Sequence, residues 1–544
     1  MSQKVLLPNR KIHKTPRLLL ADAYTVGSDL FQSEKAKEKS VYYIVFRKEL
    51  LGINPSLYNK DDNRIAFIGL GRILEKLFYE PITHAEIDEA KEFLKTYKVT
   101  LEGLKEYYFP EHLWRRVVDE FNGRPPIKVM GLPEGSIAYP NEPVVQISSE
   151  VKGFGELSAW FESKLLQVFA PSERVTQDRH WYEYLKLKIS EVDSELTKDV
   201  VNFIASTLLA DFGDRSGFNL EESEELGMYH LYTFGGTDTT SGAYQAYKNN
   251  NNIGVGSSVY ALAHRNVQAY PTEKECYEAM YENADNNSFI SMVGDLNHYK
   301  TAVKEYILPL AIRSSVEKNG KIVVARPDSG DALEEILYTI DLAIGAGLYT
   351  KRTINGKEWY FATTLKFIEA DGMSFHQMRT IIEALMERGI AFYSWGLFGV
   401  GGGLRDNIKR DHLSAKYALC AKGEENEGVV KFSDTFGKTT LPGPFKILRS
   451  LEALKNKKTI VFETEEGNDT MVEYFNGLNI NKPFGIGQDD DFSVIKNRLD
   501  EQFNSMPLTL KSDTNHNFPA SDLIISKRKE LLVKNAPDKN VNNY

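Results

Sequence analysis

Arg326 and Asp328 directly follow an apolar run, in the stretch from Val323 to Gly330 that reads VVARPDSG. A β-branched run of this kind predicts a buried strand, so both side chains are expected at its carboxyl end. A guanidinium binds an anion and a carboxylate accepts hydrogen bonds from hydroxyl groups, so the pair suits a phosphorylated sugar. A local salt bridge is the alternative for one such pair, but the pattern recurs along the chain.

Two more aspartates follow apolar runs: Asp295 comes after SFISMVG, and Asp371 comes after LKFIEA. Carboxylates gathered at strand ends can bind ribose hydroxyls, hold magnesium through water, or stabilise a developing oxocarbenium ion. Any one of them alone is explained as a helix N-cap. Three in register with Arg326 are not easily explained in that way.

A histidine and an aromatic residue stand at similar positions. His264 follows the run SSVYALA, although a lone histidine at a strand end is more often structural. Phe212 and Arg215 lie beside glycines in DFGDRSG. A flat aromatic ligand would stack on Phe212, with core packing as the alternative.

The stretch FGVGGGLRDNIKRD at 398–411 is a glycine cluster that is expected to open a helix. Backbone N–H groups at such a turn bind anions, and a flexible turn is the alternative. The spacing is not that of a dinucleotide site and there is no Walker lysine, which favours a monophosphate.

Composition limits the class of protein. The chain has 544 residues, enough for two or three domains, and a net charge of −10 without a basic block, which argues against nucleic acid as a main partner. The only cysteines, Cys276 and Cys420, provide no disulfide framework and no zinc spacing, as in a reducing cytoplasm. The sequence shows no signal peptide and no membrane span, so we expect a cytoplasmic protein without a membrane partner.

Strand and helix signals alternate through the middle of the chain. Six short apolar runs, each ending in a polar residue or glycine, are separated by helix-like stretches. This alternation predicts an α/β fold with parallel strands, arranged as a (β/α) barrel whose site lies at the carboxyl face. An open doubly wound sheet is the alternative architecture.

Several motifs occur together in one order: DFGxRxG, GTDT, a strand ending in histidine, RPDSG, a strand ending in Asp-Gly, and FGxGGGL. This series resembles the nicotinate/nicotinamide phosphoribosyltransferase family, strongly over residues 205–445. The resemblance is weaker at ADAY (21–24) and VYYIVFRK (41–48), and KFSDTFGKTTLPG (431–443) looks like the family's late lysine-rich loop.

The resemblance implies that nicotinamide attacks C1 of phosphoribosyl pyrophosphate, giving nicotinamide mononucleotide and pyrophosphate in NAD salvage. It further implies Mg²⁺, ATP as a coupled substrate, and a homodimer with shared active sites. Use of nicotinate is the nearest alternative. A sugar-phosphate lyase or isomerase, or a non-catalytic nucleotide-binding protein, is less favoured.

The resemblance also assigns the base-binding residues. Phe212 and Tyr24 of the other subunit would sandwich the pyridine ring, and Asp238 would accept a hydrogen bond from the carboxamide. Arg215 and Arg326 would hold carboxamide or phosphate groups. A carboxylate at 238 accepts from an amide but repels the carboxylate of nicotinate, so it would select nicotinamide.

The remaining assignments concern the sugar, the phosphates and catalysis. His264 matches the histidine that ATP phosphorylates, and Asp328 would hold the ribose, with Asp295 as a further catalytic residue. The ribose-phosphate and pyrophosphate groups would meet Ala370, Asp371, Gly402, Gly403, Arg410, Arg47 and Lys416. Ala370 departs from the family's usual glycine, and Asp214 from a common tyrosine.

We therefore expect an irregular (β/α) barrel with an additional α+β domain built from the N-terminal and C-terminal parts. The first domain is expected over residues 1–180, completed by about 445–514, and the barrel over 181–444. Residues 515–544 are polar and are expected to form an extended or disordered tail.

Overall fold

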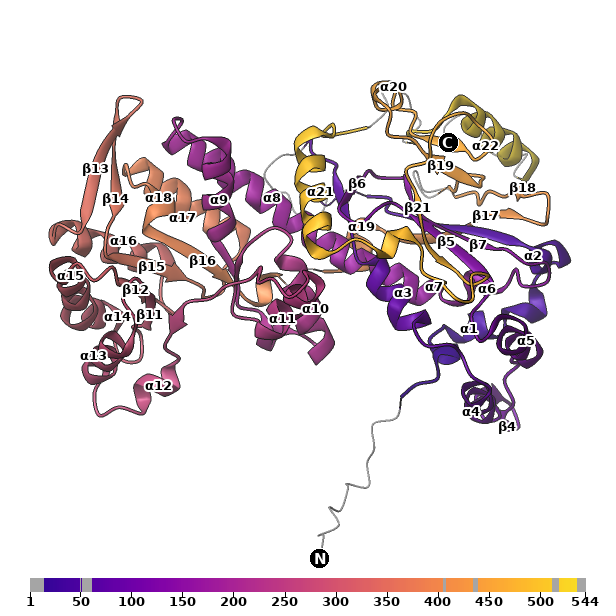
Figure 1. Ribbon diagram of the computed structural model, residues 1–544, viewed down its shortest axis with the longest axis horizontal. Coiled ribbons are helices and arrows are strands. Elements are labelled where there is room, and N and C mark those ends of the chain that lie inside the picture. Colours follow the sequence, from indigo (N-terminus) through magenta and orange to yellow (C-terminus); the bar gives the residue numbers. More distant parts are fainter. Residues whose placement is uncertain are drawn as a thin grey trace, which may run out of the picture.

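The computed structural model describes residues 14–48, 50, 61–404, 408–433, 439–510 and 518–535. Figure 1 shows two lobes, one built on a parallel sheet and the other on an antiparallel sheet. The long helix α8 (Phe169–Val192) contacts β2 (Ile65–Phe67) in one lobe and α9 (Lys198–Thr207) toward the other, and so joins the two. The α/β class and the additional domain are both confirmed.

The first lobe contains seven parallel strands in the order β10-β11-β12-β15-β16-β8-β9. Gly236 in β9 also bridges Ser257, just before β10, so the sheet curls round toward its own first strand. The strands are β8 (Leu209–Asp211), β9 (Gly236–Thr237), β10 (Tyr260–Ala261), β11 (Phe289–Val293), β12 (Ile322–Arg326), β15 (Leu365–Glu369) and β16 (Gly396–Val400). This is the irregular barrel that the alternating pattern predicts.

Helices connect these strands and pack around the curled sheet (Figure 1). Their first turns are capped by side chains: Asp331 accepts the N–H of Glu334, and Ser374 forms a capping box with Gln377. The connecting helices include α10 (Leu220–His230), α11 (Thr240–Asn249), α13 (Glu273–Asn283), α15 (Leu308–Glu317), α16 (Ala332–Gly345) and α17 (Phe375–Glu387).

The second lobe is built from both ends of the chain. Its six-stranded sheet has the order β18-β17-β1-β7-β5-β21, and every pairing in it is antiparallel. The strands are β1 (Ser40–Val45), β5 (Ile127–Gly131), β7 (Pro143–Ser149), β17 (Lys416–Lys422), β18 (Glu427–Gly428) and β21 (Val472–Asn476).

One domain boundary differs from the expectation. The strand β17 pairs with β1 along its whole length, with Tyr417 and Cys420 buried, so the chain returns to this lobe at residue 416 rather than at about 445. The sequence alternates strand and helix up to this point, and nothing in β17 itself distinguishes a barrel strand from an antiparallel one.

The C-terminal tail also differs. Residues 522–535 form helix α22 (Asp522–Asn535), which packs on β20 (Ile460–Phe462). Its buried residues Ile524, Arg528 and Leu532 are spaced four apart, the spacing of one helix face. The extended or disordered tail is therefore wrong for this segment; residues 515–517 and 536–544 lie outside the described part.

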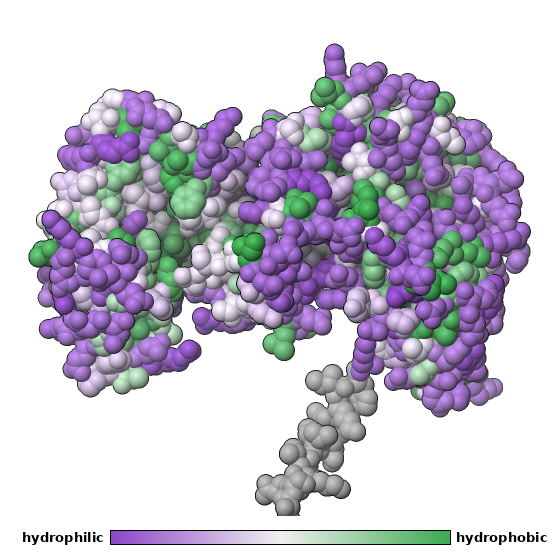
Figure 2. Space-filling view, in the orientation of Figure 1, coloured by the Kyte–Doolittle hydropathy of each residue, from purple (hydrophilic) through white to green (hydrophobic). Residues whose placement is uncertain are grey.

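Hydrophilic residues cover most of the face drawn in Figure 2, with apolar residues scattered between them in small groups. Across the described residues, no helix combines the length and the apolar character that crossing a membrane requires.

Candidate active site

The predicted residues of the first lobe follow the carboxyl ends of its parallel strands. Phe212 and Asp238 come directly after β8 and β9, and Asp328 and Asp371 come two residues after β12 and β15. Parallel strands bring these ends to one edge of the sheet, as expected. His264 differs slightly from the expectation: β10 ends at Ala261, and the histidine is the first residue of α12 (His264–Gln268).

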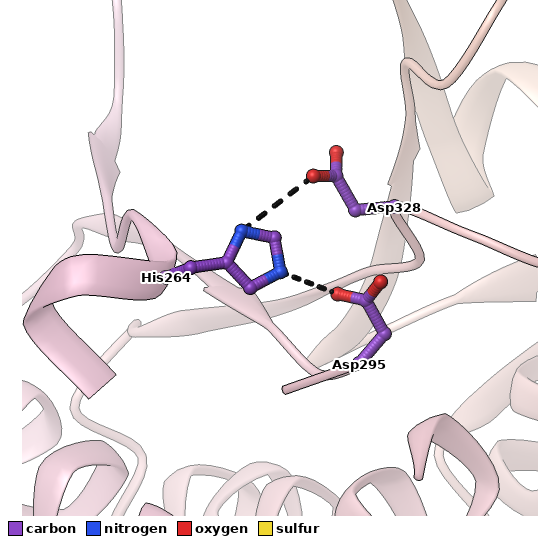
Figure 3. Close-up of side chains that lie close together, drawn as sticks. All are labelled: His264, Asp295 and Asp328. Atoms are coloured by element: carbon purple, nitrogen blue, oxygen red, sulfur yellow. Dashed lines mark hydrogen bonds and ion pairs between the residues drawn. The ribbon is translucent and has the colours of Figure 1, made fainter. Parts of the chain in front are cut away.

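Figure 3 shows His264 between two carboxylates. Its Nε2 lies 2.9 Å from Asp295 Oδ1, and its Nδ1 lies 3.7 Å from Asp328 Oδ2. Asp295 is fixed in turn, because Ser329 Oγ donates to its Oδ2 at 2.7 Å. Arg326 Nε lies 3.9 Å from the other oxygen of Asp328. The structure thus brings together the three predicted catalytic residues, His264, Asp295 and Asp328, beside Arg326, which is predicted to bind substrate.

One ligand atom from each of His264, Asp295 and Asp328 lies within 4.8 Å of the others. Mg²⁺ prefers carboxylate oxygen and retains several of its waters, so the two aspartates suit it and the imidazole does not. Asp295 is mostly buried, whereas Asp328 and His264 are partly exposed. The group is therefore accessible to a charged substrate.

A cavity of about 480 Å³ opens beside this group, and its lining is mostly apolar. Phe212, Asp238 and Arg326 all line it. Phe212 lies against β16: a Cβ at Gly399 would come 2.4 Å from the ring, so only glycine leaves room for it there. The cavity has the dimensions and the aromatic wall that a small flat ring requires.

Two polar residues of the cavity were missed by the sequence analysis. Ser258 donates from Oγ to Asp238 Oδ1, which orients the carboxylate within the cavity. Lys366 also lines it, and burial lowers the pKa of its ammonium group. A lysine between the apolar residues of the run LKFI is the signal that would have identified Lys366.

Glu369, the last residue of β15, was also missed. It is buried, and its Oε1 accepts the backbone N–H of Asp371 at 3.0 Å, which fixes the loop after the strand. Burial raises the pKa of Glu369 to about 7, and the neighbouring charges of Asp371 and Asp328 act in the same direction. The sequence identified Asp371 but took Glu369 only as part of the strand.

The loops after β15 and β16 lie against each other. A Cβ at Gly403 would come 2.7 Å from the carbonyl of Met373, and one at Gly399 would come 3.0 Å from Ala370. These loops carry Asp371 and Gly402 as predicted. The glycine run forms a 3-10 turn, η7 (Gly402–Leu404), rather than the start of a long helix, and residues 405–407 lie outside the described part.

Arg215 belongs to the same neighbourhood. It is exposed in the 3-10 turn η5 (Asp214–Ser216), and a Cβ at Gly401 would lie 3.9 Å from Ser216 Oγ. The turn that carries Arg215 therefore adjoins the glycine loop, at the same edge of the sheet as the other predicted residues.

The other predicted residues lie in the second lobe. Tyr24 is in α1 (Ala23–Val26), and 65% of it is exposed. Arg47 follows β1, whereas Arg410 is in α19 (Arg410–Leu413) and Lys416 begins β17.

Electrostatics place these second-lobe groups near one another. Burial lowers the pKa of Lys416, and the negative charge of Glu162 opposes this shift. Burial raises the pKa of Tyr24, and the charge of Glu162 adds to that shift. Burial lowers the pKa of Arg47, and the charge of Arg410 adds to the effect. The second lobe thus gathers a cationic cluster beside an exposed tyrosine.

Phe212 and Tyr24 belong to different lobes of the chain. Tyr24 lies in α1, which Figure 1 places in the second lobe, whereas Phe212 directly follows β8 in the parallel sheet of the first lobe.

Comparisons with known proteins identify relatives of this chain. Residues 207–458 match the nicotinate phosphoribosyltransferase (NAPRTase) family, and residues 17–129 match the nicotinamide phosphoribosyltransferase N-terminal domain. The chain is 28% identical to nicotinamide phosphoribosyltransferase of Xanthomonas campestris pv. campestris (strain 8004). The alignment extends over 371 residues and covers 66% of this chain and 73% of that protein.

Two solved structures share the fold. Human nicotinic acid phosphoribosyltransferase is similar with a TM-score of 0.55 and 14% identity, over 94% of this chain and 99% of that one. Nicotinate-nucleotide pyrophosphorylase from Pyrococcus furiosus is similar with a TM-score of 0.53 and 13% identity, over 92% and 98% of the two chains.

The curled parallel sheet, with its acidic and histidine groups at the carboxyl edge, is that of a phosphoribosyltransferase, a pentosyltransferase. The chain belongs to the nicotinate/nicotinamide phosphoribosyltransferase family, whose members act in NAD biosynthesis. The resemblance seen in the sequence motifs is confirmed.

Proposed function

We propose that this enzyme is a nicotinamide phosphoribosyltransferase. The observation that carries the proposal is the carboxylate of Asp238, oriented by Ser258 in the same cavity as Phe212. A carboxylate accepts a hydrogen bond from the NH₂ of a carboxamide. It repels the carboxylate of nicotinate, and like charges at close range discriminate strongly.

Phosphoribosyl pyrophosphate would lie along the carboxyl edge, with its ribose at Asp328 and its phosphates at Arg326 and the loops after β15 and β16. Asp295 and Asp328 would hold Mg²⁺, which neutralises phosphate charge when it is bound. The pyridine nitrogen of nicotinamide forms the new bond to C1 while the bond from C1 to pyrophosphate breaks. The nearby carboxylates would stabilise the positive charge that develops on the ribose.

His264 would couple ATP to this transfer. If Nε2–H donates to Asp295, the neutral imidazole keeps its lone pair on Nδ1, the nitrogen that faces Asp328 and the open site. That nitrogen would accept the terminal phosphoryl group of ATP as ADP leaves. The phosphohistidine would then favour the binding of phosphoribosyl pyrophosphate.

A homodimer would complete the site. The exposed Tyr24 and the cations around Lys416 lie in the second lobe, whereas Phe212 and the acidic residues lie in the first. A second copy that docks its second lobe on the first lobe of its partner would close the aromatic sandwich. The free, buried Cys276 and Cys420 suit a cytoplasmic enzyme.

The decisive experiment is competition for limiting phosphoribosyl pyrophosphate. Equal concentrations of nicotinamide and nicotinate are offered with Mg²⁺, with and without ATP, and both mononucleotides are quantified. We expect mainly nicotinamide mononucleotide, in larger yield with ATP. A predominance of nicotinate mononucleotide would instead establish the alternative, nicotinate phosphoribosyltransferase.

A further inference from the structure

A buried carboxylate in α8 holds the segment that carries Arg410. Glu173 is fully buried, and its Oε1 lies 2.5 Å from Nδ1 of His412. Its other oxygen, Oε2, accepts the backbone N–H of Lys409 at 3.2 Å. One side chain therefore binds the residue before Arg410 and the second residue after it.

The opposite side of the segment is held by Arg47. The N–H of Arg47 donates to the carbonyl of Leu413 at 2.9 Å, and its guanidinium donates to the carbonyl and the hydroxyl of Ser414 at 3.1 and 3.0 Å. Residues 409–414 are thus fixed between α8 and the end of β1. The exposed guanidinium of Arg410 forms an ion pair at 2.8 Å with Asp411, a surface carboxylate in its own helix.

The proposed function leaves this arrangement unexplained, because neither Glu173 nor His412 has a role in it. We propose that Glu173 and His412 are positioning residues, whose buried contact sets where Arg410 stands relative to the pyrophosphate group of the substrate. This inference rests on the proposed function. Burial raises the pKa of Glu173 to about 7, with His412 as the largest opposing influence, so the carboxylate depends on that contact.

The contact is specific to one nitrogen of the imidazole, and this makes it testable. An asparagine at 412 places its amide nitrogen near the position of Nδ1, whereas a glutamine carries it one carbon further. The variants H412N, H412Q and H412L therefore keep, displace and remove the donor. Q177L is the matched control: Gln177 also donates to Glu173 Oε1, at 3.1 Å, but it does so from within α8 itself.

The kinetics should divide these variants. We expect H412Q and H412L to raise KM for phosphoribosyl pyrophosphate, and the inhibition constant of pyrophosphate, by about tenfold or more, since small displacements of a binding group are costly. KM for nicotinamide should stay within about twofold. H412N and Q177L should behave like wild type, and melting temperatures identify any variant that is merely misfolded.

A double variant tests whether the two residues act as a unit. If they do, E173Q combined with H412L should be no worse than the more affected single variant. Equal behaviour of H412N, H412Q and H412L in an active enzyme would overturn the positioning role and leave the proposed function intact. A wild-type enzyme that releases no pyrophosphate from phosphoribosyl pyrophosphate would overturn the proposed function and this inference with it.

Discussion

The two lobes carry opposite chemistry and assemble it in different ways. In the first lobe, His264, Asp295 and Asp328 each follow a parallel strand, and neighbouring strands place them side by side. In the second lobe, Tyr24 and Lys416 are almost four hundred positions apart in sequence, yet the charge of Glu162 acts on both, and the strand that begins at Lys416 pairs with β1. One lobe provides carboxylates and an imidazole, and the other provides cations and an exposed ring.

This difference bears directly on assembly. A phosphoribosyl donor carries a sugar that suits carboxylates and a pyrophosphate that suits cations. The first lobe offers carboxylates together with Arg215, Arg326 and Lys366, and the second lobe adds the cationic cluster around Lys416. The comparison therefore predicts that each active site combines the first lobe of one chain with the second lobe of another.

The strongest test of this division mixes two chains that are each impaired in a different lobe. Asp328→Ala damages the first lobe and should lower activity by about a hundredfold or more, since it removes a preorganised charge. Tyr24→Ala damages the second lobe and should cost roughly tenfold through lost stacking. After subunit exchange, about half of the dimers are hybrids with one intact site, so about a quarter of the wild-type activity should return.

The control is a chain that carries both substitutions, mixed with the Asp328→Ala chain, because none of their hybrid dimers contains an intact site. A mixture that shows only the activity of the Tyr24→Ala chain, although native mass spectrometry detects hybrid dimers, would mean that each site is built within one chain.

Within the first lobe, Asp238 should set the choice of base. We expect Asp238→Ser to lower kcat/KM for nicotinamide and raise it for nicotinate, because it removes a like charge from the cavity. A contact of this kind is worth about 2–5 kcal/mol, or upward of thirtyfold in preference. Ser258→Ala is the matched control, since it removes the partner of Asp238 but keeps the charge. An unchanged preference in Asp238→Ser would place the selector elsewhere.

His264 should affect coupling to ATP more than the transfer itself. We expect His264→Ala to retain slow ATP-independent synthesis and to lose ATP stimulation, a coupling effect of about 5–150-fold. Acid-labile phosphate incorporated from labelled ATP should also disappear. Wild-type enzyme that incorporates none would limit His264 to a contact with pyrophosphate.

Much of the first lobe could be predicted from sequence, because strand-end residues are local. The run IVVAR forms the strand β12, and Asp328 follows two residues after its carboxyl end, as predicted. Short strands were harder to predict. The apolar run YHLYTFGG (229–236), taken as one of the six predicted strands, contains the last two residues of α10 followed by a turn, and the strand β9 is only Gly236 and Thr237. A strand of two residues such as β9 forms because pairing with neighbouring strands outweighs local propensity.

The second lobe shows where such reasoning ends. The stretch DDNRIAFIGLGRILEKLF has helical periodicity, yet Ile65–Phe67 form β2 before α3 (Leu70–Phe78) begins. β2 is buried on both sides and pairs with β6 (Ser136–Ala138), seventy residues away, which no local pattern encodes. The contact between Glu173 and His412 joins residues 239 positions apart, and so it became visible only in the structure.

The two lobes also differ in how they pair their buried carboxylates, and we expect a smaller effect from this difference. In the second lobe, both oxygens of the buried Glu142 accept from Arg449 at 2.9 Å. In the first lobe, Oε2 of the buried Glu369 has no hydrogen-bond partner among the described residues, and burial raises its pKa to about 7. Removing the charge should therefore change the free energy of unfolding in opposite directions at Glu142 and at Glu369.

Between pH 4.5 and 7 the native Glu369 holds a proton that the unfolded chain has released, so this group lowers stability progressively as the pH rises through that window. Glu369→Gln should leave the free energy of unfolding nearly unchanged at pH 5 and raise it by about 1–3 kcal/mol at pH 8. Glu142→Gln should instead lower it at both values, because it breaks a buried pair. Chemical denaturation at the two pH values measures both, and a Glu369→Gln variant equally destabilised at pH 5 and pH 8 would show that this carboxylate is stabilised by the fold after all.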